Sequence, residues 1–348
     1  MTIDMNQGLE WQPPEGQHRV QTIDAHTGGE PFRVILSGYP ELEGSTILER
    51  RRSALEHHDA LRTALMWEPR GHADMYGCVL VPPQTAGADF GILFLHNEGY
   101  STMCGHGIIA ITTVVLESGM LQSTGPETEV RIDTPAGLVV ARGKMEGGRV
   151  TSVAFTNVPS FVLLADQAVQ VQGLGTVRYD VAYGGAFYAY VDATEVGVTL
   201  GPESFQQLID KGMAIKRAVM AAGGITHPFE QDLSFLYGTI FTGVPLSDGA
   251  DSRNVCIFAE GEVDRSPTGT GVSARAAIHH ARGEFEVGEE MVIESIIGSR
   301  FKVRVLEETE FGPFPAVIPE VEGSASITGR NEFVIDSDDP LRDGFILR

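Results

Sequence analysis

The chain is organised around the stretch Asn97-Glu98-Gly99-Tyr100-Ser101-Thr102-Met103-Cys104-Gly105-His106-Gly107-Ile108-Ile109-Ala110, where a predicted strand passes into a predicted helix. Residues 90–95 are an apolar run typical of a strand, and residues 108–116 are typical of a buried helix that ends before Gly119. Cys104 therefore stands at a strand-to-helix turn. The first N–H groups of a helix lack intrahelical partners and carry positive partial charge, which favours a thiolate and can also bind a carboxylate. We expect an activated thiol whose pKa lies below that of a free cysteine.

A second stretch repeats this design: Val263-Asp264-Arg265-Ser266-Pro267-Thr268-Gly269-Thr270-Gly271-Val272-Ser273-Ala274. It again places a small side chain before Gly-x-Gly at the start of a predicted helix, residues 272–280, which closes near Gly283. Here Thr268 takes the place of the thiol. The two stretches predict two similar halves, each presenting a glycine-rich helix start to a shared cleft.

Charge and composition narrow the classes of partner. The chain has 348 residues, 42% of them apolar, with 41 Gly, 18 Pro and a formal net charge of −22. Such a charge repels nucleic acid and anionic membrane surfaces. Residues 1–17 lack the features of a signal peptide, and no segment is long and apolar enough for a membrane helix. We expect a cytoplasmic protein that acts on a small molecule.

The cysteines and histidines favour thiol chemistry over metal binding. Three cysteines without CxxC spacing argue against a disulfide framework and against zinc. Cys78 and Cys256 fall in strand-like runs and are interpreted as core residues. The pair His57-His58, taken with His72, fits no tight ligand set, so we predict no metal.

Short strands dominate the predicted secondary structure. Helices are expected at residues 55–66 and 202–221 besides the two glycine-rich ones, and residues 177–182 and 186–191 are expected to form a hairpin. No regular βαβ rhythm is present, so the pattern predicts an α+β fold rather than a parallel nucleotide-binding sheet.

Each candidate residue also has a purely structural interpretation. A free cysteine is usually a buried small hydrophobe, although its place before Gly-His-Gly favours catalysis for Cys104. Thr268 alone would be a helix N-cap. Asp264 could cap the loop or pair with Arg265, or bind a substrate ammonium. His106 could contact substrate, orient the thiol, or be structural.

Four motifs resemble the proline racemase superfamily of cofactor-independent epimerases and dehydratases, over nearly the whole chain. They are His26-Thr27-Gly28-Gly29-Glu30-Pro31, Gly71-His72-Ala73-Asp74-Met75-Tyr76-Gly77, Met103-Cys104-Gly105-His106-Gly107 and Asp264-Arg265-Ser266-Pro267-Thr268-Gly269-Thr270-Gly271. Members that racemise have a cysteine at each helix start. At the second helix start this sequence has Thr268 instead of a cysteine, and in this it resembles the trans-3-hydroxy-L-proline dehydratase branch of the family.

The resemblance implies two pseudo-symmetric domains, each a mixed sheet wrapped around a central helix, as in diaminopimelate epimerase. We expect the first domain over residues 1–165 and the second over residues 166–324, with residues 325–348 returning to the first. By the same resemblance Cys104 and Thr268 are the catalytic pair, no cofactor is needed, and a homodimer is one assembly left open. The substrate contacts implied are Gly105, His106, Asp264, Gly269 and Thr270, and Asp232 is a further residue that could face the cleft.

Inversion at a stereocentre needs an acid and a base on opposite faces, and a threonine hydroxyl is a poor substitute for a thiol. In trans-3-hydroxy-L-proline the α-hydrogen and the hydroxyl lie on the same ring face, so one thiol suffices for loss of water. We expect Cys104 to remove the α-proton and give Δ1-pyrroline-2-carboxylate. The alternatives are a 4-hydroxyproline 2-epimerase or proline racemase in which Thr268 relays a proton, and a non-catalytic amino-acid-binding protein. A cysteine hydrolase is a weaker alternative, because no partner set beyond His106 is evident.

Overall fold

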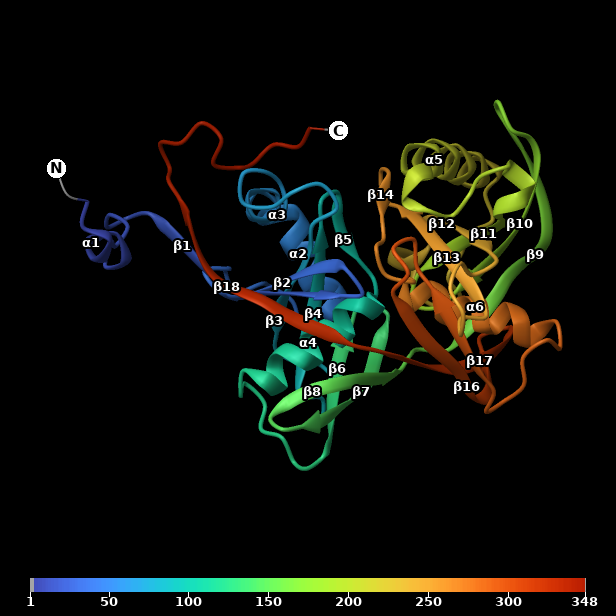
Figure 1. Ribbon diagram of the computed structural model, residues 1–348, viewed down its shortest axis with the longest axis horizontal. Helices are drawn as coiled ribbons and strands as arrows, with labels where there is room; N and C mark the ends of the chain where they lie inside the picture. The colour runs from blue at the N-terminus through green and yellow to red at the C-terminus, as the bar shows by residue number, and fades with distance from the viewer. Residues whose placement is uncertain (1–2, 348) are drawn as a thin grey trace.

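The computed structural model describes residues 3–347 and has a mixed α/β fold with many strands and few helices (Figure 1). Its helices are α1 (Met5–Leu9), α2 (Ile47–His57), α3 (Asp59–Met66), α4 (Gly105–Glu117), α5 (Phe205–Ala222) and α6 (Gly269–Ala281). Its strands are β1 (His18–Thr27), β2 (Glu30–Ser37), β3 (Tyr76–Val81), β4 (Phe90–His96), β5 (Gly99–Ser101), β6 (Glu127–Thr134), β7 (Gly137–Glu146), β8 (Arg149–Thr156), β9 (Ser160–Val171), β10 (Gly175–Tyr183), β11 (Phe187–Asp192), β12 (Leu236–Gly243), β13 (Ser252–Phe258), β14 (Glu262–Val263), β15 (Glu290–Glu294), β16 (Arg300–Phe311), β17 (Phe314–Gly323) and β18 (Ala325–Ile335).

One set of strands closes a ring around α6. The pairings run from β17 to β9, continue through β10, β11, β12, β13 and β15 to β16, and return to β17. Inside this ring α6 packs against β9, β10, β16 and β17. Every residue of α6 from Gly269 to Ile278 is buried. The ring therefore fixes the position of the helix start, because an enclosed helix has little room to shift in a close-packed core.

A second set of strands surrounds α4. It comprises β1, β2, β3, β4, β6, β7 and β8, and β18 joins it by antiparallel pairing with β1. All residues of α4 from Gly105 to Leu116 are buried, mainly against β8, β1, β7 and β18. In Figure 1 the α4 and α6 groups lie on opposite sides, and the red ribbon of β17 and β18 runs from one to the other. The last strand of the chain thus lies beside the first.

The helix predicted at residues 55–66 is wrong in its extent. The chain instead forms α2 and α3, which meet at His58, where the backbone leaves helical geometry. The start of α2 is a capping box: the Thr46 hydroxyl accepts from the Glu49 backbone N–H, and the Glu49 carboxylate accepts from the Thr46 N–H. The sequence Thr-x-x-Glu at 46–49 indicates a helix start there, but the prediction used only the apolar periodicity and therefore placed the start at residue 55.

The other predicted elements lie close to the observed ones. The helix predicted at 202–221 corresponds to α5, and the predicted hairpin is the antiparallel pair of β10 and β11. The two glycine-rich helices begin earlier than expected, at Gly105 and Gly269, so that the Gly-x-Gly segments form the first helical turn themselves.

Candidate active site

The two glycine-rich helix starts touch each other. A Cβ atom built on Gly105 would lie 2.6 Å from the Gly269 Cα, and one built on Gly269 would lie 2.8 Å from the Gly105 Cα. Carbon atoms in contact normally lie roughly 3.5–4.0 Å apart, so only glycine fits at both positions. This contact brings Cys104 and Thr268, each the residue before its helix, to one place.

Cys104 is the N-cap residue of α4 and is buried. Its Sγ accepts from the Gly107 backbone N–H at 3.3 Å and lies 3.3 Å from the His106 Nδ1. Burial raises the pKa of the Cys104 thiol well above its ordinary value and outweighs the opposing effect of the Gly107 N–H. The expected lowering of this pKa is therefore wrong, because the closed pocket removes the water that would solvate a thiolate.

His106 is a neutral imidazole beside that thiol. Burial lowers its pKa to about 3, although a hydrogen bond to the Pro31 backbone favours the charged form. A neutral imidazole has one N–H that donates and one nitrogen that accepts. Both ring nitrogens lie near the Cys104 Sγ, Nδ1 at 3.3 Å and Nε2 at 3.6 Å, so His106 can accept from the thiol or donate to the thiolate.

Thr268 precedes α6 in a strained conformation. Its φ is +68°, a value that β-branched residues rarely adopt, and strain of this kind clusters at functional sites. Its side chain makes no capping hydrogen bond, which argues against the simple N-cap interpretation. The buried hydroxyl partly offsets the rise that burial causes in the pKa values of the adjacent Asp264 carboxyl and Cys256 thiol, yet it has no partner at normal hydrogen-bond geometry within residues 3–347.

Asp264 supplies a buried carboxylate. It accepts from the Ser266 backbone N–H at 2.7 Å, and burial raises its pKa to about 6. The next residue, Arg265, holds this loop to the α4 group: its guanidinium pairs with Asp74 at 2.6 Å, and its backbone N–H donates to Glu30 at 2.7 Å. Burial and the charge of Asp264 raise the pKa of Glu30.

All seven residues predicted for the site line one small pocket with an empty volume of about 290 Å³. They are Cys104, Gly105, His106, Asp264, Thr268, Gly269 and Thr270. The Thr270 hydroxyl lies 2.7 Å from that of Tyr188. Asp232 lies elsewhere, at the surface in a short 3-10 turn (Gln231–Leu233), where its carboxylate pairs with Arg52 at 3.1 Å.

Sequence reasoning missed six further lining residues: Tyr76, Met103, Tyr188, Tyr237, Cys256 and Phe258. Tyr76 and Met103 stand inside quoted motifs, so their neighbourhood to Cys104 could have been inferred. The other four come from β11, β12 and β13, and nothing local marks them. Cys256, interpreted as a core residue, is fully buried and also borders the pocket beside Thr268.

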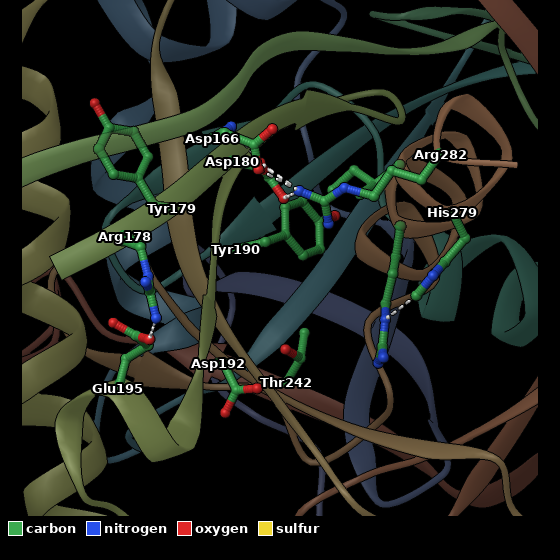
Figure 2. Close-up of a pocket in the computed structure, with 12 residues that line it drawn as sticks. Asp166, Arg178, Tyr179, Asp180, Tyr190, Asp192, Glu195, Thr242, His279 and Arg282 are labelled. Carbon is green, nitrogen blue, oxygen red and sulfur yellow. Dashed lines mark hydrogen bonds and ion pairs between the residues drawn. The ribbon is translucent and has the colours of Figure 1, made fainter. Parts of the chain in front are cut away.

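A larger pocket of about 910 Å³ lies elsewhere on the α6 group (Figure 2). Its α6 residues, Arg275, Ile278 and His279, lie in the middle and last turns rather than at the helix start. Figure 2 shows two of its arginines in ion pairs: Arg178 with Glu195, and Arg282 with Asp166 and Asp180. The small pocket is the better candidate, because of the two pockets only the small one is lined by the helix starts and by a thiol.

Among residues 3–347, no group of three or more His, Cys, Asp or Glu side chains is arranged to hold a metal ion. Within the same part of the chain, no helix combines the length and apolar character required to span a membrane.

Comparisons with known proteins agree on the family. Residues 22–346 match the proline racemase family model. The chain is 48% identical to a trans-3-hydroxy-L-proline dehydratase of Colwellia psychrerythraea, covering 97% of this chain and 96% of the relative. It is 47% identical to a 3-hydroxyproline 2-epimerase of Burkholderia multivorans, covering 94% and 98%. A hydroxyproline epimerase of Agrobacterium vitis with bound trans-4-hydroxy-L-proline superposes with a TM-score of 0.90 at 35% identity, covering 95% of each chain.

Proposed function

Because the chain belongs to the proline racemase family, we propose that it is an enzyme that dehydrates trans-3-hydroxy-L-proline to Δ1-pyrroline-2-carboxylate. The observation that carries this proposal is the unequal pair at the touching helix starts, with a thiol at Cys104 and a hydroxyl at Thr268. Relatives named trans-3-hydroxy-L-proline dehydratase at 47% and 48% identity support it.

Substrate binding follows from the charges that the pocket presents. The first-turn N–H groups of α4 and α6 suit the substrate carboxylate, apart from the Gly107 N–H, which donates to the Cys104 Sγ. The Asp264 carboxylate, ionised above its pKa of about 6, suits the ring ammonium. A bound ammonium also brings positive charge near Cys104, which lowers the cost of forming its thiolate in this buried place.

Catalysis then needs one base. The Cys104 thiolate takes the α-proton, the electron pair of the broken C–H bond forms the Cα–Cβ double bond, and the C3–O bond breaks. The helix starts stabilise the charge that develops on the carboxylate. The oxygen leaves as water after gaining a proton, and the enamine tautomerises to the cyclic imine. No base on the opposite face takes part, so Thr268 needs only to line the pocket there.

We further propose that the α4 and α6 groups are two pseudo-symmetric domains, over residues 1–165 and 166–324, with residues 325–348 returning to the first. Corresponding short distances at the two helix starts support this division. A Cβ on Gly107 would lie 2.9 Å from the Cys104 Sγ, and one on Gly271 would lie 3.1 Å from the Thr268 Cγ2. In each Gly-x-Gly segment, the second glycine thus lies against the side chain of the residue that precedes the helix.

Epimerisation is the second candidate, and two observations favour it. One relative at 47% identity is named 3-hydroxyproline 2-epimerase. In addition, Cys256 places a second thiol at the pocket, beside Thr268. Proton transfer from this thiol through the Thr268 hydroxyl would reach the face opposite Cys104.

Proton NMR in deuterated buffer separates these candidates. The reduced protein is offered trans-3-hydroxy-L-proline, trans-4-hydroxy-L-proline and L-proline in turn. Conversion of the first into the cyclic imine is expected. Deuterium at the α-carbon with the hydroxyl retained would mean an epimerase, and binding without reaction of any of the three would mean a binding protein.

Two cysteine variants test the assignment of the base. Cys104→Ser is expected to lose turnover by about 10²–10⁴-fold while staying folded, the range for a lost acid–base group. Cys78→Ser is the matched control, because Cys78 is also a buried thiol but lies on β3 within the core. A fully active Cys104→Ser variant would contradict the assignment.

A further inference from the structure

Three hydroxyl groups meet at Tyr76, which lines the same pocket as Cys104. The Tyr76 hydroxyl donates to the Ser101 Oγ and lies 3.1 Å from the Tyr237 hydroxyl. Both tyrosines line the pocket, and Ser101 is fully buried. Tyr76 therefore stands at the centre of a small hydrogen-bond chain that is shielded from bulk water.

Tyr76 lies on the same side of the pocket as Cys104. Both belong to the α4 group, Tyr76 on β3 and Cys104 at the start of α4. The Tyr76 ring meets the His106 ring edge to face at 4.8 Å between centroids, and the His106 Nδ1 is 3.3 Å from the Cys104 Sγ. Hydrogen bonding by Tyr76 also favours the thiolate form of Cys104.

The proposed dehydration needs a proton donor on this side. The α-hydrogen and the 3-hydroxyl of trans-3-hydroxy-L-proline share one ring face, so a substrate whose α-hydrogen points at Cys104 also points its hydroxyl toward the α4 group. Hydroxide is a poor leaving group without a proton. His106 is a poor donor, because it is a neutral imidazole that holds its single N–H proton tightly. Burial keeps the Tyr76 phenol protonated by raising its pKa.

We propose that the Tyr76 O–H, which donates to the Ser101 Oγ in the free protein, turns to the 3-hydroxyl of the substrate and gives it the proton with which it leaves as water. This inference rests on the proposed function and deepens it. The Cys104 thiolate takes the α-proton while the Tyr76 O–H bond breaks toward the departing oxygen. The Ser101 and Tyr237 hydroxyls then donate to the tyrosinate oxygen, and the Cys104 thiol returns its proton to Tyr76. The cycle ends with the thiolate and phenol restored and one water released.

Tyr76→Phe tests this role, because it removes only the hydroxyl. Dehydration of trans-3-hydroxy-L-proline is expected to slow by about 10²–10⁴-fold. Without this acid the elimination divides into two steps and C–O cleavage becomes rate-limiting, so the isotope effect of α-deuterated substrate falls toward one. In a substrate with chloride at C3, the chloride leaves without a proton. Elimination of chloride is therefore expected to slow less than about threefold in Tyr76→Phe if Tyr76 acts only on the leaving group.

Tyr183→Phe is the matched control, because it removes a buried tyrosine hydroxyl from β10, outside the pocket, that has no hydrogen-bond partner among residues 3–347. It is expected to keep the wild-type rate. If Tyr76→Phe does not fold, Tyr237→Phe with Ser101→Ala gives the same test, with an expected loss of about tenfold on the hydroxy substrate alone. Equal losses on the hydroxy and chloro substrates would overturn the role of Tyr76. Failure of the wild-type protein to dehydrate would instead overturn the proposed function.

Discussion

A methyl group at Gly105 is expected to disable the site by separating the two helix starts. In Gly105→Ala the new Cβ would lie 2.6 Å from the Gly269 Cα, 3.0 Å from the Gly269 carbonyl carbon and 3.1 Å from the Phe155 Cζ. Two of these three atoms are backbone in a buried helix, so a change of rotamer cannot relieve the clash. A normal carbon–carbon contact needs roughly 3.5 Å, so the helix starts must move apart by about 1 Å.

That displacement sets the size of the effect. Overpacking of this kind costs roughly 1–3 kcal/mol of stability. A misplacement of about 1 Å can cost about 10²-fold in rate, because the reacting groups leave their near-attack geometry. We therefore expect kcat for trans-3-hydroxy-L-proline to fall by about 100-fold, while the folded protein survives with a lower Tm.

The assay is the steady-state rate of imine formation, measured beside the thermal unfolding curve. Gly125→Ala is the control, because its Cβ would meet nothing closer than 3.9 Å and its φ is not positive. Gly269→Ala should behave as Gly105→Ala does, since its Cβ would lie 2.8 Å from the Gly105 Cα. A Gly105→Ala variant with wild-type kcat would refute the idea that the touching helix starts define the catalytic geometry.

Three further predictions follow from the charged and polar groups of the site. Because burial raises the pKa of Asp264 to about 6, kcat/KM should fall about tenfold per pH unit below that value, as the carboxylate that attracts the substrate ammonium is neutralised. Asp264→Asn should have a low kcat/KM at every pH and should not show this acid-side decline. A pH profile equal to that of the wild type would contradict the role of Asp264 in binding the ammonium. Thr268→Cys should introduce exchange or inversion at the α-carbon, seen by NMR in deuterated buffer, and its absence in a folded variant that binds substrate would count against the two-face argument. Burial raises the pKa of Glu30, so the folded protein holds that proton more tightly than the unfolded chain, and its contribution to stability is lost as pH rises through the folded pKa. Glu30→Gln should therefore gain Tm relative to the wild type as the pH rises above the ordinary carboxyl pKa of about 4.3, whereas parallel Tm curves would show that Glu30 does not titrate.

The sequence predicted which residues form the site better than it predicted the environment of those residues. Cys104 and Thr268 are marked by the glycines that follow them, because helix starts are local features readable within a few residues. The pKa of Cys104 went the other way from the expectation, since a helix start lowers it only where water can still reach the sulfur. The amount of water around a thiol depends on every chain segment packed against it.

Distant segments supply the rest of the pocket. Tyr188, Tyr237 and Cys256 come from β11, β12 and β13, which the closed ring around α6 brings to the helix start. Their strands resemble ordinary buried strands, so no pattern along the chain distinguishes a lining residue from a core residue. Asp232, by contrast, looked like a candidate and lies at the surface with Arg52.

The sequence by itself determined the two buried helices, the glycines at their starts and the unequal pair Cys104 and Thr268, because each depends on residues that are neighbours in the chain. Only the tertiary structure decided that Gly105 touches Gly269, that Tyr76 shares a hydrogen-bond chain with Tyr237, and that the thiol is cut off from water. These properties arise from pairings between strands far apart in sequence. Their free energy comes from close packing of the closed fold, which no local pattern encodes.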